Sequence, residues 1–282
     1  MPILPSSIKS PVEHLTAECM GTVIDGELVY LAKKSKSHIF KEELNMKHIK
    51  MAAGLAHVDY GHIADLVAEA DAAGVDYIHS DAADMHDLKN MQLMGGHQII
   101  EGIRPYTKKD IECHIYTRDC DRLFIEKIAA AGCNMLILPA EHFLGAPLAY
   151  IINYCREFGM KIGLTLGCYT PLCFVDEAIY DIDRLQLVVH GVDDTDGKDN
   201  WGWRRSAVDL IRRSREMVDA KNPKCELAID GGLRVDNMDA AIACNPDVIV
   251  LSSAIFKDRE GITAGVKKCR KAIDEAVMKY QL

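Results

Sequence analysis

The feature that most constrains this fold is a helical pattern that ends in glycine and is followed at once by an apolar run. The phrase recurs as EADAAGVDYIHSD, KIAAAGCNMLILPA and YCREFGMKIGLTLG, with Gly74, Gly132 and Gly159 at the junctions. Glycine is common just beyond the last helical turn because it adopts the left-handed conformation without strain. The apolar runs are short and rich in Ile, Val and Leu, which is typical of strands buried on both faces of a parallel sheet. The repeat therefore predicts alternating helices and parallel strands.

Eight such strand–helix units follow one another along most of the chain. Strands are expected at 47–54, 75–81, 111–117, 134–140, 160–167, 183–191, 224–232 and 246–256. Helices are expected at 61–74, 121–132, 146–159, 206–220, 235–244 and 261–280, with another from about Pro171, whereas residues 82–105 are polar and rich in Met. A doubly wound open sheet uses the same alternation, but eight units over about 235 residues favour a closed (β/α)8 TIM barrel of class α/β. The lack of a GxGxxG motif after the first strand agrees with the barrel.

Residues 1–46 do not fit the repeat. The stretch GTVIDGELVYLAK places Asp25-Gly26 between two β-rich runs, which is a strong signal for a β-hairpin. We therefore expect an N-terminal extension with a hairpin (1–46), followed by a single catalytic barrel (47–282). No function is assigned to the extension.

Charge and composition exclude several classes of function. The chain has 33 Lys and Arg against 42 Asp and Glu, a net charge of -9, and no long basic run, so nucleic-acid binding is not expected. No apolar stretch approaches the roughly 18 residues of a membrane span, and the N-terminus lacks the basic and apolar regions of a secretory signal. The ten cysteines form no CxxC pair, which favours reduced thiols packed as small hydrophobes in a cytoplasmic protein.

Four residues with metal-binding side chains stand at the ends of β-rich runs. They are His79, Asp81, His114 and Asp230. His79 and Asp81 are two apart, so on a strand their side chains share one face. If the strands close into one barrel, that face can be the interior, and the C-terminal strand ends are where such barrels carry their chemistry. Two imidazoles and two carboxylates suit one divalent ion, and this mixed set does not discriminate among Zn, Mn, Co and Fe.

Several motifs in chain order resemble the ribulose-phosphate 3-epimerase family over about residues 47–260. The family segment HxDxMDGxFVPN on the second strand is matched at 79–90, where His79, Asp81, Asp84 and Asn90 are in place. The other matches are HIYT at 114–117, GLTLGCYTP at 163–171, IDGG at 229–232 and SSAIF at 252–256. Each motif alone is weak, but together they stand on the expected strands in the expected order.

The resemblance implies a metal-dependent epimerase that inverts C3 of a ketose or ketose phosphate. It implies one divalent metal ion held by His79, Asp81, His114 and Asp230. It also implies that Asp81 and Asp230 are the catalytic acid–base pair, one removing the C3 proton and the other returning a proton to the opposite face. The metal would stabilise the enediolate, and the two carboxylates would need opposite protonation states.

The substrate end departs from the family pattern. The fourth-strand HxE is Pro139-Ala140-Glu141, and the glycine loop NPGFGGQ is replaced by 190–201, which contains four aspartates. Those carboxylates should repel a phosphate, so a weakened phosphate site is expected. The candidates for substrate contact are the backbone N–H groups of Gly231, Gly232, Ser252 and Ser253 and the side chains of Glu141 and His190, although a structural role is the commoner one for the last two.

Two alternatives stay open at the sequence level. A metal-dependent aldolase or decarboxylase on the same barrel would stabilise an enediolate without needing a second base. A non-catalytic sugar-binding relative would need neither base, although such a protein would be expected to lose at least one of the four residues. The expected partner in each case is a small-molecule sugar. Barrels of this kind often self-associate, so a homo-oligomer is expected.

Overall fold

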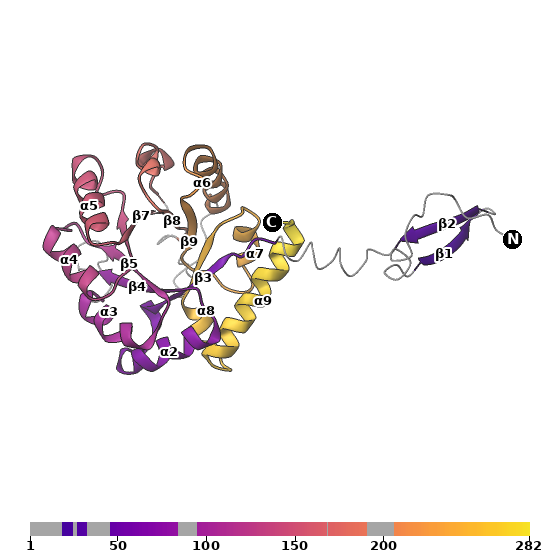
Figure 1. Cartoon of the computed structure of the whole chain (residues 1–282), viewed down its shortest axis with the longest axis horizontal. Helices are drawn as coiled ribbons and strands as arrows, with labels where there is room; N and C mark the ends of the chain where they lie inside the picture. The colour runs from indigo at the N-terminus through magenta and orange to yellow at the C-terminus, as the bar shows by residue number, and fades with distance from the viewer. Residues whose placement is uncertain (1–18, 25–26, 33–45, 84–94, 168, 191–205) are drawn as a thin grey trace, which may run out of the picture. The chain divides into compact units, whose positions relative to one another are not determined.

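Figure 1 shows the computed structural model of the chain. The structure describes residues 19–24, 27–32, 46–83, 95–167, 169–190 and 206–282. The chain divides into two units, Met1–Lys47 and His48–Leu282. In the first unit, β1 (Cys19–Ile24) and β2 (Glu27–Ala32) pair antiparallel, with Ile24 opposite Glu27. The hairpin strands expected from the sequence are therefore present, and the expected turn at Asp25-Gly26 lies outside the described residues.

The second unit is a closed barrel of parallel strands. In order around the barrel these are β3 (Lys50–Gly54), β4 (Tyr77–Ala83), β5 (Asp110–Tyr116), β6 (Met135–Pro139), β7 (Lys161–Leu166), β8 (Arg184–Val188), β9 (Glu226–Asp230) and β10 (Val248–Leu251). Each strand pairs with its neighbour in the sequence, and β10 closes the ring by pairing in parallel with β3. The predicted (β/α)8 barrel is confirmed.

Helices surround the strands, as Figure 1 shows. They are α2 (Ile63–Ala73), α3 (His97–Ile103), α4 (Arg122–Ala130), α5 (Ala146–Glu157), α6 (Ala207–Lys221), α7 (Met238–Ile242), α8 (Ser253–Phe256) and α9 (Ile262–Tyr280). The backbone of Gly74 has a φ of 100° at the C-cap of α2, and its N–H bonds the carbonyls of Ala70 and Asp71. This is the helix-ending role that the sequence predicted for the junction glycines. Within the described residues, no helix is long and apolar enough to cross a bilayer.

Three element assignments from the sequence were wrong. The helix expected from Pro171 is two 3₁₀ turns, η5 (Leu172–Val175) and η6 (Ala178–Tyr180), whose i→i+3 hydrogen bonds replace those of an α-helix. The strand expected at 246–256 ends at Leu251, since the chain then turns into α8. Conversely, α3 forms in the segment where no helix was expected, and it buries Ile100 and Ile103, which are spaced for one helical face.

The apolar core lies between the strands and the helices, while polar side chains enter the barrel. Along β4 and β8, Ile78, Leu185 and Leu187 are fully buried at positions that alternate with His79 and Gln186. Because successive strand residues point to opposite faces, this alternation packs one set against the helices and directs the other set inward. The barrel interior is therefore available for chemistry without loss of the main core.

The cysteines among the described residues are free thiols. They are Cys113, Cys120, Cys133, Cys155, Cys173, Cys225, Cys244 and Cys269. Five of these are buried, and burial raises the pKa of Cys133 and of Cys155 to about 12. These thiols stay protonated at neutral pH and pack as small apolar groups, as the sequence predicted.

Asp76, just before β4, contacts three other residues at the end of the barrel where the strands begin: His48, Met51 of β3 and Arg270 of α9. Its Oδ2 accepts hydrogen bonds from the Met51 N–H and from Arg270 of α9, each at 2.8 Å, and its Oδ1 lies 3.0 Å from His48 Nε2. Burial opposes ionisation, but the hydrogen bonds from His48 and Met51 hold the pKa of Asp76 below its ordinary 3.8. The ionised carboxylate therefore stabilises the fold.

We expect Asp76→Asn to lower the free energy of unfolding at pH 7 by about 1–3 kcal/mol, since Arg270 loses its charged acceptor. A depressed pKa adds stability that is fully present above the unfolded pKa and is lost as the pH falls through the folded pKa. The difference between wild type and variant should therefore shrink as the pH drops below about 4. Urea unfolding across a pH series measures it, and an equal difference at neutral and acidic pH would contradict the assignment.

Candidate metal and acid–base site

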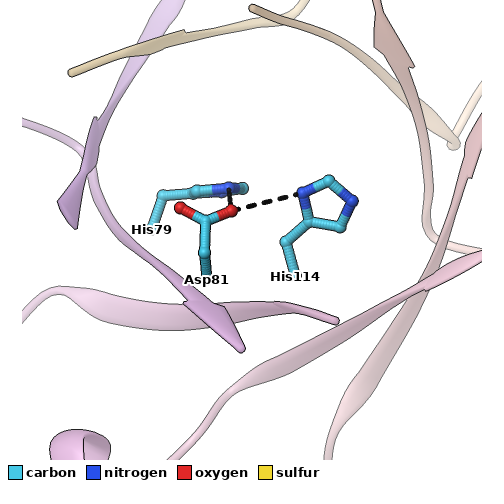
Figure 2. A group of neighbouring side chains, drawn as sticks. All are labelled: His79, Asp81 and His114. Atoms are coloured by element: carbon cyan, nitrogen blue, oxygen red, sulfur yellow. Dashed lines mark ion pairs between the residues drawn. The ribbon is translucent and has the colours of Figure 1, made fainter. Parts of the chain in front are cut away.

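The four residues singled out from the sequence come together inside the barrel. His79 and Asp81 lie on β4, His114 lies on the adjacent β5, and Asp230 is the last residue of β9. The parallel register places Asp81 opposite His114. Figure 2 shows the Asp81 carboxylate between the two imidazoles, with the ring of strands around them. We call these four side chains the ligand cluster.

Three members of the ligand cluster, His79, Asp81 and His114, offer atoms that all lie within 4.8 Å of one another, and Asp230 adjoins the two imidazoles. Asp81 Oδ1 lies 3.5 Å from His79 Nε2 and 3.6 Å from His114 Nδ1. Asp230 Oδ2 lies 3.9 Å from His79 Nε2 and 3.6 Å from His114 Nδ1. Ligands at about 2.1 Å from a tetrahedral ion stand about 3.4 Å from one another. The His79 Nε2 atom is also buried without a hydrogen-bond partner among the described residues, so the donor set fits a divalent metal.

Burial and charge act against each other in the ligand cluster. Both imidazoles are buried, Asp81 is nearly so, and the Asp230 side chain keeps 17% of its surface exposed. Burial disfavours a carboxylate, yet His79 and His114 hold the pKa of Asp81 well below its usual value. Burial would lower the pKa of His79, but Asp81 and Glu112 raise it well above its usual value. The cluster therefore attracts positive charge, which a proton or a metal ion can supply.

Three residues that the sequence analysis missed contact the ligand cluster or its supports. Glu112 Oε1 lies 2.7 Å from His79 Nδ1, and Arg184 forms an ion pair with Glu112. Gln186 Nε2 lies 3.1 Å from both His114 Nδ1 and Asp230 Oδ2. A signal was present, because each is a polar residue at an alternating position within an otherwise apolar strand.

The candidates for substrate contact follow the C-terminal ends of four strands, but their contacts are with the protein. Glu141 Oε1 accepts a hydrogen bond from the Gly167 N–H at 3.0 Å and another from the Thr170 hydroxyl. Gly231 has a φ of 99°, and a Cβ there would lie 2.0 Å from His190 Nδ1. Substrate contact by these residues therefore stays a prediction.

Two of the remaining candidates lie where β10 passes into α8. Ser252 is the residue before that helix, and Ser253 is its exposed first residue. Gly232, beyond β9, has a φ of 64°, a backbone conformation that favours glycine. Asp84, Asn90 and the acidic stretch at 192–200 lie outside the described residues.

Comparison by sequence places the match over the barrel. Residues 50–256 match the sequence model of the Ribulose-phosphate 3 epimerase family. Ribulose-phosphate 3-epimerase 1 of Cupriavidus necator is 30% identical over 223 residues, covering 76% of this chain and 89% of that protein. Ribulose-phosphate 3-epimerase of Buchnera aphidicola is 29% identical over 233 residues, covering 82% of this chain and 97% of that protein.

Comparison by structure finds barrels of the same fold. A 3-hexulose-6-phosphate synthase from Salmonella typhimurium has a TM-score of 0.63 at 17% identity, covering 81% of this chain and all of that one. A 3-keto-L-gulonate-6-phosphate decarboxylase from Vibrio cholerae has a TM-score of 0.60 at 15% identity, covering 82% of this chain and 99% of that one. At these identities the likeness concerns the fold, and barrels of one fold carry many chemistries.

Proposed function

The chain belongs to the ribulose-phosphate 3-epimerase family, and we propose that it inverts C3 of a ketose or ketose phosphate with one divalent metal ion. At the coarser level it is an isomerase that acts on carbohydrates. The strongest support for the finer proposal is that two carboxylates, Asp81 and Asp230, meet the same two buried imidazoles.

The proposed acid–base pair enters the barrel from separate strands. Asp81 is on β4 and Asp230 ends β9, and β10 and β3 stand between them in the ring. Inversion at C3 requires one group to take a proton from one face and another group to deliver a proton to the other face. We assign these two tasks to Asp81 and Asp230. In the reverse reaction the tasks exchange, so each carboxylate must both accept and donate.

The residues that would hold the ion offer two nitrogen and two oxygen atoms. These are His79 Nε2, His114 Nδ1, and one carboxylate oxygen each from Asp81 and Asp230. When bound, a divalent ion would polarise the substrate carbonyl and offset the negative charge that develops as the C3 proton leaves. Mixed nitrogen and oxygen donors are compatible with Zn, Mn, Co or Fe.

The proposal leaves two substrate classes to be separated by experiment. The backbone amides near Gly231, Gly232, Ser252 and Ser253 support an anionic group, whereas the aspartates at 192–200 disfavour one. We propose that this chain binds a phosphate group more weakly than the family's motifs would predict. Free ketoses should therefore be turned over at rates within about a thousandfold of the phosphorylated sugar.

Solvent deuterium exchange tests the reaction and the substrate class together. Metal-loaded protein is incubated in heavy water with D-ribulose 5-phosphate and, separately, with free D-ribulose and D-xylulose, and the sugars are followed by NMR. We expect deuterium at C3 together with the C3 epimer. A metal-stripped sample is the control. No exchange with any ketose despite bound metal would instead favour a lyase or a non-catalytic sugar-binding protein.

A further inference from the structure

Strand β8 contributes no member of the ligand cluster, yet two of its side chains point into the barrel towards that cluster. Arg184 and Gln186 are two residues apart, so they share a face, and both are fully buried. Burying a guanidinium or a carboxamide costs free energy unless its hydrogen bonds are met inside the protein. Where those hydrogen bonds go therefore indicates what the two residues do.

Arg184 contacts the ligand cluster indirectly, through the Glu112 carboxylate. It forms an ion pair with Glu112 Oε2, while the other oxygen of Glu112 lies 2.7 Å from His79 Nδ1. On its far side Arg184 donates to Glu226 Oε2 at 2.7 and 3.2 Å, and Lys50 lies 2.5 Å from Glu226 Oε1. Two cations thus face two carboxylates, and each oxygen of Glu112 has its own partner, Arg184 on one side and His79 on the other.

The orientation of His79 follows from this arrangement. The Glu112 carboxylate accepts a hydrogen bond from the Nδ1–H group, which leaves the Nε2 lone pair directed to the opposite edge of the ring. That edge faces Asp81 Oδ1 at 3.5 Å and Asp230 Oδ2 at 3.9 Å. Because Arg184 holds the second oxygen of Glu112, the carboxylate cannot rotate without breaking a buried ion pair.

Gln186 contacts two other members of the ligand cluster, Asp230 and His114. Its Nε2 donates to Asp230 Oδ2 at 3.1 Å and lies 3.1 Å from His114 Nδ1. Asp230 is the last residue of its strand, so its side chain has less packing to restrain it than a residue in mid-strand. The carboxamide of a fully buried neighbour supplies that restraint.

We infer that β8 is a positioning strand for the ligand cluster. Arg184, acting through Glu112, orients His79, and Gln186 orients Asp230. Two of the four members thus take their orientation from a strand that supplies none of them. The inference rests on the proposed function, because it presupposes that the cluster binds a metal ion.

Cobalt binding to the full-length, metal-stripped protein tests the inference. The dissociation constant of Co²⁺ and the visible absorption spectrum of the bound ion are measured for wild type, Glu112→Gln and Gln186→Met, with thermal unfolding of each metal-free protein. We expect both variants to bind Co²⁺ about 10–100-fold more weakly and to show an altered spectrum. The spectrum reports ligand geometry, which a loss of stability alone does not change.

Two matched controls separate positioning from packing. Glu226→Gln removes the other carboxylate on Arg184. The hydrogen bonds of Glu226 are with Arg184, Lys50 and Tyr77, outside the ligand cluster. Thr165→Val alters a buried polar residue of β7 that is paired in register with Gln186. Both should keep the wild-type spectrum and bind Co²⁺ within about threefold of wild type.

Three outcomes are decisive. Folded Glu112→Gln and Gln186→Met proteins with wild-type affinity and spectrum would overturn the inference. If Glu112→Gln does not fold, the double variant Glu112→Gln/Arg184→Met removes both charges of the buried pair, and the same weakening and spectral change are expected of it. Wild-type protein that binds no Co²⁺ would overturn the metal-dependent function itself, and the inference with it.

Discussion

Asp81→Asn and Asp230→Asn are each expected to reduce epimerisation by about 10²–10⁴-fold, because each removes one of the two groups that must exchange a proton with C3. The amide keeps the size of the side chain and can still bind through its oxygen, but it cannot accept the C3 proton. Rates should be measured at saturating metal with the metal content of each sample determined, since both residues also belong to the ligand cluster.

The pattern of isotope exchange is more specific than the loss of rate. A protein with one remaining base can still exchange the C3 proton of the epimer that presents it to that base. We therefore expect Asp81→Asn to label one epimer from heavy water and Asp230→Asn to label the other, with inversion lost in both. Asp110→Asn, at the exposed start of β5, is the matched control and should keep wild-type exchange.

Two results would contradict this two-base assignment. Inversion that stays within about tenfold of wild type in either variant would exclude that carboxylate as a base. Cleavage of a carbon–carbon bond by the wild-type protein, retained in part by Asp230→Asn, would instead identify a lyase. The fold is shared by a synthase and a decarboxylase, so the reaction products must be identified directly.

Removal of the metal is expected to abolish activity, and Zn, Mn, Co or Fe should restore it. An ion that binds only the folded protein also stabilises it, by about 2.7 kcal/mol at a hundred times its dissociation constant. Thermal unfolding of stripped protein with and without added ion measures this effect. His114→Ala removes one buried ligand and should lose most of the stabilisation.

One result would contradict the metal prediction. Full activity in a preparation shown by elemental analysis to be metal-free would exclude the metal from the reaction. A comparison of His114→Ala with wild type tests whether the metal binds elsewhere on the protein. If His114→Ala is stabilised by added ion as strongly as wild type, the ion does not bind at the ligand cluster.

Much of the site was predictable because it depends on local periodicity. His79 and Asp81 share a face since strand side chains alternate, and any strand at 75–81 would present them together. Each of the four candidate metal ligands stands at the end of an apolar run, and parallel strands place such ends at one rim. These relations require only that the strands form.

The contacts that orient the ligand cluster were decided by closure of the barrel. Glu112 and Arg184 are 72 residues apart in the chain and meet because β5 and β8 face the same narrow interior. The same is true of His114 and Gln186. The alternating pattern of each strand indicates that these polar residues face inward, but it does not identify the partner that each one contacts.

Short-range pattern in the sequence thus predicted the barrel and the candidate metal ligands, whereas the acid–base roles of Asp81 and Asp230 came from the resemblance to the epimerase family. Tertiary structure alone decided that Asp230 meets His79 and His114, that Arg184 and Gln186 support them, and that the segment after Pro171 forms 3₁₀ turns. The physical reason is that these features depend on distances across a closed ring, which are set when β10 pairs with β3.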